Sequence, residues 1–173
     1  MSASLAVICH QLDANTDHTT SQLLNGITSL GVEACLYSSQ DIISNIGDFD
    51  QFDGFVFEAS SSQSMDQIVK AFSGAATMRK ETGLWRDKLA AGFSKESESK
   101  AHSLRAMMDF SIFCNSQNMV WLSSGIQVDG IGEHHPAMNS SMGNAPVLEG
   151  VLYQAYRHGQ YLASVAQRWQ PDN

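Results

Sequence analysis

Short apolar runs alternate with helix-like stretches along most of this chain. The runs occupy residues 5–9, 32–37, 52–57, 88–93 and 119–122. Apolar runs of this length, separated by helical patterns, are typical of a parallel sheet that helices cover on both faces. We therefore predict an α/β fold, a three-layer α/β/α sandwich around a five-stranded parallel sheet. Right-handed crossover connections favour the strand order 2-1-3-4-5 for that sheet.

Four stretches carry the spacing of apolar side chains that is typical of amphipathic helices. The first covers residues 20–30, and Gly31 follows it as a residue that ends helices well. The others cover residues 65–78, with Ser64 as the N-cap, and residues 99–113 and 147–169. Residues 38–51 are interpreted as a linker with at most one helical turn, and residues 125–144 as a long irregular loop. We find no repeat and no domain-splitting linker, so residues 1–173 are predicted to form one domain.

The composition is that of a globular protein with few positive charges. Hydrophobic residues make up 43% and charged residues 16% of the 173 residues, and the net charge is −8. Because phosphate binding depends on Lys and Arg, this balance disfavours nucleic acids and anionic membranes as partners. No apolar run approaches the roughly 20 residues that span a bilayer, and the first residues do not resemble a signal peptide. Cys9, Cys35 and Cys114 lie in or beside apolar runs and are interpreted as buried thiols, which favours a cytoplasmic location.

The carboxyl ends of the predicted strands are where we expect a ligand. In an open parallel sheet, ligands bind in the crevice at the carboxyl edge, at the point where the winding of the chain reverses. The loops after the first, third and fourth apolar runs meet at this edge. They are rich in hydroxyl and charged side chains and poor in glycine.

Four segments resemble the flavodoxin-like NAD(P)H:quinone oxidoreductases of the WrbA type. Residues 52–57 are similar to the strand before the family's second cofactor loop, and residues 72–93 to a helix, a glycine-and-aromatic turn and the fourth strand. Residues 118–125 are similar to the fifth strand and its turn, and residues 155–169 to the C-terminal helix. The resemblance covers most of the chain. It implies a flavodoxin-like fold, FMN as the cofactor, NAD(P)H as the co-substrate and a quinone-like acceptor as the small-molecule ligand.

The resemblance also implies which residues would hold FMN. In the family, the first loop binds the phosphate with backbone N–H groups at a helix N-terminus, and the second and third loops lie against the flavin ring. The corresponding residues are Asn15, Thr16, Asp17, His18, Thr19 and Ser21 in the first loop, Ser60, Ser61, Ser62 and Gln63 in the second, and Ser94, Lys95, Glu96 and Ser97 in the third. A homodimer or homotetramer is implied as well, although the insertion that helps to form the family's tetramer is absent between Ser38 and Phe52.

The three loops depart from the family pattern while the strands and helices match it. Asp17 stands where the family has glycine, and Asp13 adds a second carboxylate, which repels a phosphate by roughly 1 kcal/mol or more. The proline, arginine, aromatic and glycine of the family's second loop are absent, and only Ser94 remains of its third loop. Two hypotheses therefore stay open. The chain is an FMN-dependent NAD(P)H oxidoreductase, or it is a scaffold that has lost FMN and acts as a non-catalytic binding or assembly protein.

The remaining residues that could have a functional role are interpreted as loop or packing residues. Asp129, Glu133, His134 and His135 lack the ligand spacing of a zinc site, so an exposed loop is favoured, although the same region closes over the flavin in the family. No nucleophile motif is present. Two tryptophans and five methionines are interpreted as packing residues: Trp85, Trp121, Met65, Met78, Met107, Met108 and Met119.

Overall fold

A five-stranded parallel sheet forms the centre of the molecule. The computed structural model describes residues 2–10, 18–59, 62–94, 100–123 and 145–169. The sheet has the order β2-β1-β3-β4-β5, and every neighbouring pair is parallel. The strands are β1 (Ser4–Cys9), β2 (Glu33–Ser38), β3 (Gly54–Glu58), β4 (Leu89–Phe93) and β5 (Val120–Leu122). The predicted fold class and strand order are confirmed.

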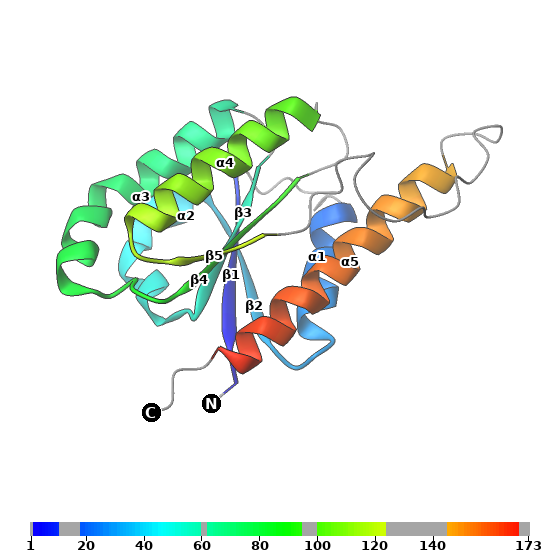
Figure 1. The fold of residues 1–173 in the computed structure, drawn as a ribbon, viewed down its shortest axis with the longest axis horizontal. Coiled ribbons are helices and arrows are strands. Elements are labelled where there is room, and N and C mark those ends of the chain that lie inside the picture. The colour runs from blue at the N-terminus through cyan, green and yellow to red at the C-terminus, as the bar shows by residue number, and fades with distance from the viewer. Residues whose placement is uncertain (1, 11–17, 60–61, 95–99, 124–144, 170–173) are drawn as a thin grey trace.

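Helices cover both faces of the sheet, which gives the three layers. Figure 1 shows α1 (His18–Thr28) and α5 (Ala145–Arg168) side by side on one face. On the other face lie α2 (Ser39–Asn45), α3 (Ser62–Thr82) and α4 (Lys100–Ser116), and the short 3-10 helix η1 (Ile46–Gln51) leads into β3. None of the helices that the structure describes combines the length and apolar character needed to cross a bilayer.

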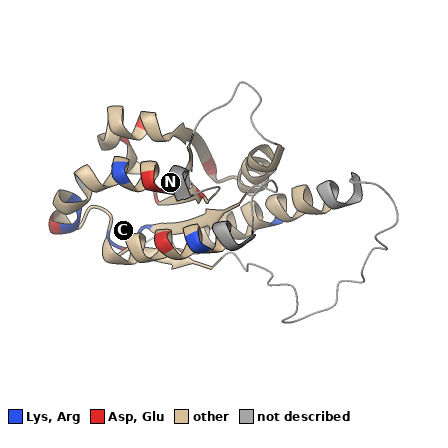
Figure 2. Ribbon diagram, turned by 90° about the horizontal axis from the view of Figure 1, so that it is seen from above, with Lys and Arg blue, Asp and Glu red and all other residues tan. Residues whose placement is uncertain are grey.

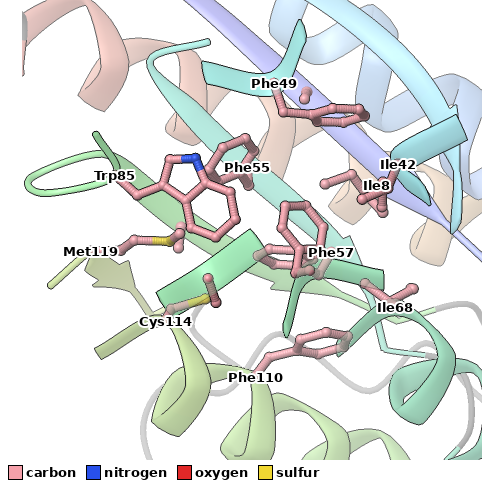
Figure 3. Close-up of a cluster of buried hydrophobic side chains, with 14 of the residues drawn as sticks. Ile8, Ile42, Phe49, Phe55, Phe57, Ile68, Trp85, Phe110, Cys114 and Met119 are labelled. Carbon is pink, nitrogen blue, oxygen red and sulfur yellow. The ribbon is translucent and has the colours of Figure 1, made fainter. Parts of the chain in front are cut away.

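Each face of the sheet has its own hydrophobic core, because both faces of the central strands are buried. On the face of α2, α3 and α4, aromatic rings from strands and helices interdigitate (Figure 3). Phe57 of β3 stacks on Phe110 of α4 with ring centroids 4.8 Å apart, and Phe55 meets Trp85 edge to face at 5.9 Å. The opposite core is mostly aliphatic, with Phe93 of β4 as an aromatic member, and it joins β1, β3 and β4 to Leu23, Ile27 and Leu162 of the two helices.

Three sequence predictions about this face are corrected by the structure. Residues 38–51 are not a linker but form α2 and η1, because Ser38 and Asp41 form a capping box that starts α2. Helix α3 begins at Ser62, so Ser64 lies inside the helix and is not its N-cap. Met78 and Met108 do not pack in the core, since 53% and 56% of their surface is exposed.

Other packing predictions are confirmed. Trp85, Met107 and Met119 are buried, and Trp121 packs at the edge of the core. Cys9 and Cys114 are buried as predicted, whereas Cys35 is only half-buried. Burial raises the pKa of the Cys114 thiol, which keeps it protonated and unreactive.

A buried ionic cluster closes the amino edge of the sheet. The Arg79 guanidinium at the end of α3 donates from Nε and Nη2 to the two carboxylate oxygens of Asp50, at 2.6 and 2.9 Å. The Trp85 indole N–H donates to the same carboxylate at 2.9 Å, and the guanidinium lies 5.3 Å from the Trp85 ring centroid. Lys88 donates from Nζ to the carbonyl oxygens of Asp50 and Phe52, while burial lowers the pKa of its ammonium group. This cluster ties η1, α3 and the start of β4 together at the end of the sheet opposite the expected ligand edge.

Helices α1 and α5 cross at two glycines. A Cβ atom built on Gly26 would lie 2.1 Å from the carbonyl oxygen of Tyr156, and one on Gly159 would lie 2.2 Å from that of Leu23. Only a residue without a side chain allows the two backbones to approach this closely. The crossing fixes the depth at which α5 sits over the sheet.

Candidate functional site

The chain changes direction between β1 and β3, at the centre of the sheet. From β1 it continues through α1 on one face to β2, and from β2 it returns through α2 on the other face to β3. The carboxyl ends of β1 and β3 therefore carry connections that diverge to opposite faces, and ligands of open α/β sheets bind at such a divergence. This edge of the sheet is the candidate functional site.

The end of β1 supplies a histidine with an unused ring nitrogen. Cys9, the last strand residue, is buried, and His10 follows it. The carbonyl oxygen of His10 accepts a hydrogen bond from Ser39 Oγ at 3.0 Å, which anchors this residue to the first turn of α2. The Nδ1 atom of His10 is buried and finds no hydrogen-bond partner in the described part of the chain. A buried ring nitrogen in this state is able to donate to or accept from a ligand.

The first turn of α1 points its N-terminus at the same edge. His18 is exposed there, Ser21 is half-buried, and Thr19 and Thr20 are buried. Only 2% of Thr20 is exposed, and its hydroxyl oxygen has no hydrogen-bond partner among the residues that the structure describes. Leaving a buried hydroxyl unpaired costs about 1–3 kcal/mol. A ligand that accepts or donates a hydrogen bond at this hydroxyl would remove that cost, and the dipole at the start of the helix favours an anion.

The ends of β3 and β4 complete the edge. Glu58 is the last residue of β3 and is buried, and the N–H of Ala59 donates to the carbonyl oxygen of Phe93 at 2.7 Å, which continues the strand pairing by one residue. Ser94 follows β4 and is exposed. From α5, His158 Nε2 lies 3.3 Å from the carbonyl oxygen of Gly92 in β4. Burial lowers the pKa of His158, so its neutral ring donates to that carbonyl.

The residues predicted to bind a cofactor fall into two groups. His18, Thr19 and Ser21 lie in the first turn of α1, Ser62 and Gln63 belong to the first turn of α3, and Ser94 follows β4. The topology brings these three segments to one edge of the sheet. The others lie outside the described residues: Asn15, Thr16, Asp17, Ser60, Ser61, Lys95, Glu96 and Ser97. Asp13, Asp129, Glu133, His134 and His135 lie outside them too, and the described residues contain no group of side chains that could hold a metal ion.

Sequence reasoning missed four residues of this edge. His10 and Glu58 could have been found, because each is a titratable residue at the end of an apolar run. Thr20 was not named as a binding residue, because the pairing state of its hydroxyl depends on tertiary contacts. His158 lies 66 residues from its partner Gly92, and no local pattern connects them.

Solved structures with the same arrangement of strands and helices are known. A WrbA-like flavodoxin from Agrobacterium tumefaciens has a TM-score of 0.67 and 18% identity, covering 98% of this chain and 100% of that one. The fold is flavodoxin-like. A flavodoxin from the domain Archaea has a TM-score of 0.54 and 15% identity over 95% of this chain and 99% of its own. A flavoenzyme NAD(P)H:(acceptor) oxidoreductase from Paracoccus denitrificans has a TM-score of 0.54 and 13% identity over 94% of this chain and 98% of its own.

These proteins are similar to the chain in structure but share little of its sequence. No family model matches the chain, and no curated protein sequence matches it. The flavodoxin-like fold therefore rests on the sheet topology and on the near-complete coverage in both directions. The function of the carboxyl edge is inferred from its own residues.

Proposed function

We propose that this chain is a flavoprotein that holds FMN at the carboxyl edge of its sheet and transfers electrons from NAD(P)H to a quinone-like acceptor. The observation that carries the proposal is the unpartnered hydroxyl of Thr20, buried in the first turn of a helix that starts at the divergence of β1 and β3. A phosphate at this helix N-terminus would accept a hydrogen bond from that hydroxyl and from backbone N–H groups. The names of the structurally similar flavodoxin and flavoenzyme support the same class of ligand.

The residues at this edge fit a phosphorylated flavin. The Thr20 hydroxyl and backbone N–H groups in the first turn of α1 would hold the phosphate, together with residues 15–17. His10 Nδ1 is the second unused polar atom at this edge, and its proton would be available to a negative ligand. The flavin ring would lie between residues 60–63 and residues 94–97. Bound FMN would supply the redox chemistry, accepting hydride and passing electrons on, while these residues set its position and exclude water.

A titration tests the binding step. We would follow FMN fluorescence as protein is added and compare the wild-type chain with Thr20→Val, which keeps the shape and removes the hydroxyl. Because a hydrogen bond to a charged group is worth about 1.5–3 kcal/mol, FMN affinity should fall roughly 10-fold to 150-fold. Thr28→Val is the control, since Thr28 is exposed at the other end of α1 and its hydroxyl donates to the carbonyl of Leu24 at 3.0 Å.

Two further measurements separate phosphate binding from a general loss of structure. Without FMN, Thr20→Val should be as stable as the wild type or more stable, because it removes an unpaired buried hydroxyl. Asp17→Gly should bind FMN more tightly, because it removes a carboxylate next to the phosphate. If FMN binds but neither Thr20→Val nor Asp17→Gly changes its affinity, the phosphate is not held at α1.

The oxidoreductase step is tested by adding NAD(P)H and a quinone to the FMN-loaded protein. We expect nicotinamide absorbance to fall when the quinone is added, and comparing NADH with NADPH identifies the preferred donor. FMN binding without NAD(P)H oxidation would refute the activity and leave the flavoprotein proposal standing.

One observation favours the second function, a scaffold that has lost FMN and acts in binding or assembly. Glu58 places a buried carboxylate at the carboxyl end of β3, and in the sequence Asp13 and Asp17 come between β1 and α1. Negative charges near a dianionic phosphate would oppose its binding. A colourless protein that leaves FMN fluorescence unchanged would support this function and refute the first.

A further inference from the structure

Helices α1 and α5 border an open hollow beside the point where they cross. Gly26 and Gly159 bring the two backbones into contact at the crossing. One turn earlier in α1, and one to two turns earlier in α5, side chains of both helices line a hollow of about 430 Å³. One lining residue comes from α1 and three come from α5: Gln22, Leu152, Tyr153 and Tyr156. We call this space the α1–α5 hollow.

The α1–α5 hollow lies on the side of α1 away from the Thr20 hydroxyl. Successive helix residues point about 100° apart, so the side chain of Gln22 points about 160° away from that of Thr20. Thr20 is buried, whereas Gln22 is half-buried and faces the hollow. The hollow is therefore separate from the place where a phosphate would meet the first turn of α1.

The size and apolar lining of the α1–α5 hollow are those of a small-molecule site. Such sites have volumes of about 300–1,000 Å³ and are lined mostly by apolar and aromatic side chains, with a few polar groups that orient the ligand. Two tyrosine rings and a leucine supply the apolar surface here. The Gln160 side chain donates to the Tyr156 hydroxyl at 3.3 Å, which holds one of the two rings in place. Aromatic rings pack well against other flat rings, in offset or edge-to-face contact.

The polar groups of the α1–α5 hollow are neutral. The Gln22 amide and the Tyr153 hydroxyl face it, and no hydrogen bond within the described part of the chain occupies either group. No Lys, Arg, Asp or Glu is among its described lining residues, and α1 contains none at all. Figure 2 shows both helices mostly in tan, the colour of residues other than these four. A charged ligand would lose water there without gaining a partner of opposite sign, so a neutral ligand is favoured.

We propose that the α1–α5 hollow binds a neutral, planar aromatic molecule that carries a hydrogen-bonding group at its edge. The rings of Tyr153 and Tyr156 pack against the aromatic rings of the ligand, and Leu152 adds apolar contact. The Gln22 amide both donates and accepts hydrogen bonds, so it pairs with a hydroxyl or a carbonyl group of the ligand. This proposal does not depend on flavin binding, because the hollow and the Thr20 hydroxyl lie on different sides of α1.

Isothermal titration calorimetry of the whole chain with 2-naphthol tests the proposal, because this compound is neutral, has two fused aromatic rings and carries one hydroxyl group. For a ligand of this size we expect saturable binding at one site, with a Kd on the order of 0.1 mM. The matched ligand is 2-naphthalenesulfonate, which has the same rings and a negative charge. It should bind at least about 10-fold more weakly, because no cation lines the hollow.

Two variants test whether 2-naphthol binds in the α1–α5 hollow. Tyr156→Ala removes one of the rings and should weaken binding about 10-fold or more. Leu152→Trp removes no ring and fills the hollow with a larger side chain, so it should abolish binding. Tyr161→Ala is the matched control, since Tyr161 is 44% exposed on the same helix and does not line the hollow, and it should bind as the wild type does. Urea unfolding of each variant shows whether it is folded.

Several results would overturn the proposal. They are a wild type that shows no saturable binding of 2-naphthol, equal affinity for the sulfonate, binding that survives Leu152→Trp in the folded variant, and an equal loss of binding in Tyr161→Ala. Competition between FMN and 2-naphthol would overturn it as well, because the flavin would then occupy the hollow. A chain that binds 2-naphthol in this pattern but does not bind FMN would support this proposal and refute the flavoprotein.

Discussion

Replacing Gly159 by alanine should separate two helices and destabilise the fold. An ideal Cβ at this position would lie 2.2 Å from Leu23 O, 2.9 Å from Ile27 N and 3.0 Å from Gly26 Cα, whereas ordinary contacts begin near 3.4 Å. All three obstacles are backbone atoms, so no flexible side chain can turn away. Helix α5 must therefore move outward by about 1 Å, and Leu162, Ala163 and Ala166, which it buries in the aliphatic core, must move with it.

The size of the effect follows from two opposing terms. Overpacking of this kind costs about 1–3 kcal/mol, and here the upper end applies because only the backbone can yield. Alanine is better than glycine inside a helix by about 1 kcal/mol, which offsets part of that cost. We expect Gly159→Ala to lose about 2 kcal/mol of unfolding free energy, which lowers the Tm by roughly 4–8 °C for a chain of this size.

The same helix offers a matched control. Gly150 also lies in α5, but a Cβ there meets nothing within 4 Å. Gly150→Ala should therefore stabilise the protein by about 0.5–1 kcal/mol through helix propensity alone. Urea unfolding at neutral pH measures both variants. If Gly159→Ala were as stable as Gly150→Ala, the close backbone crossing of α1 and α5 would be refuted.

Three further perturbations test other parts of the structure. Asp50→Asn leaves the buried Arg79 guanidinium without its carboxylate and should lower the free energy of unfolding in urea by about 3–5 kcal/mol. Asp109→Asn, at an exposed ion pair, should change it by less than about 0.5 kcal/mol. Equal effects of the two variants would contradict the buried cluster. Burial lowers the pKa of His158, so the unfolded chain binds a proton at this histidine more readily than the folded chain does. The free energy of unfolding should therefore fall as the pH drops from about 6.5 through the folded-state pKa. His158→Gln should flatten that part of the stability–pH profile, and an unchanged profile would argue against the buried neutral ring. Ser38→Ala removes the N-cap of α2 and should lower the free energy of unfolding by about 1 kcal/mol. Because hydrogen bonds from Ser38 lower the pKa of Asp41, part of this loss should disappear as the pH falls below 3.8 through the lowered pKa. A loss that does not depend on pH would exclude Asp41 from the cap.

Local periodicity was enough to predict the architecture. Strands and helices differ in the spacing of their apolar residues, and that spacing is visible within a few residues of sequence. The five apolar runs became the five strands, and the crossover rule ordered them correctly. Helix α2 was missed because it is short and polar, although its capping box, Ser38 and Asp41, was present in the sequence.

The location of the candidate site was predictable from the sequence, but the hydrogen-bonding state of its side chains was not. The carboxyl edge follows from the strand order alone, and His18, Thr19, Ser21 and Ser94 lie there as expected. That Thr20 has a buried hydroxyl without a partner depends on how α1 packs on the sheet, which no local pattern encodes.

By itself, the sequence determined the fold class, the order of the strands and which segments lie at the carboxyl edge of the sheet, because these depend on short-range periodicity and on chain connectivity. Only the tertiary structure decided which neighbours in a helix face inward. Met107 is buried and Met108 exposed, although both are methionines in one apolar stretch, because successive helical residues point about 100° apart. The tertiary structure also decided that Asp50 bonds Arg79, 29 residues away in the sequence, and that α1 touches α5 through two glycines. Such contacts form only when distant segments pack against each other.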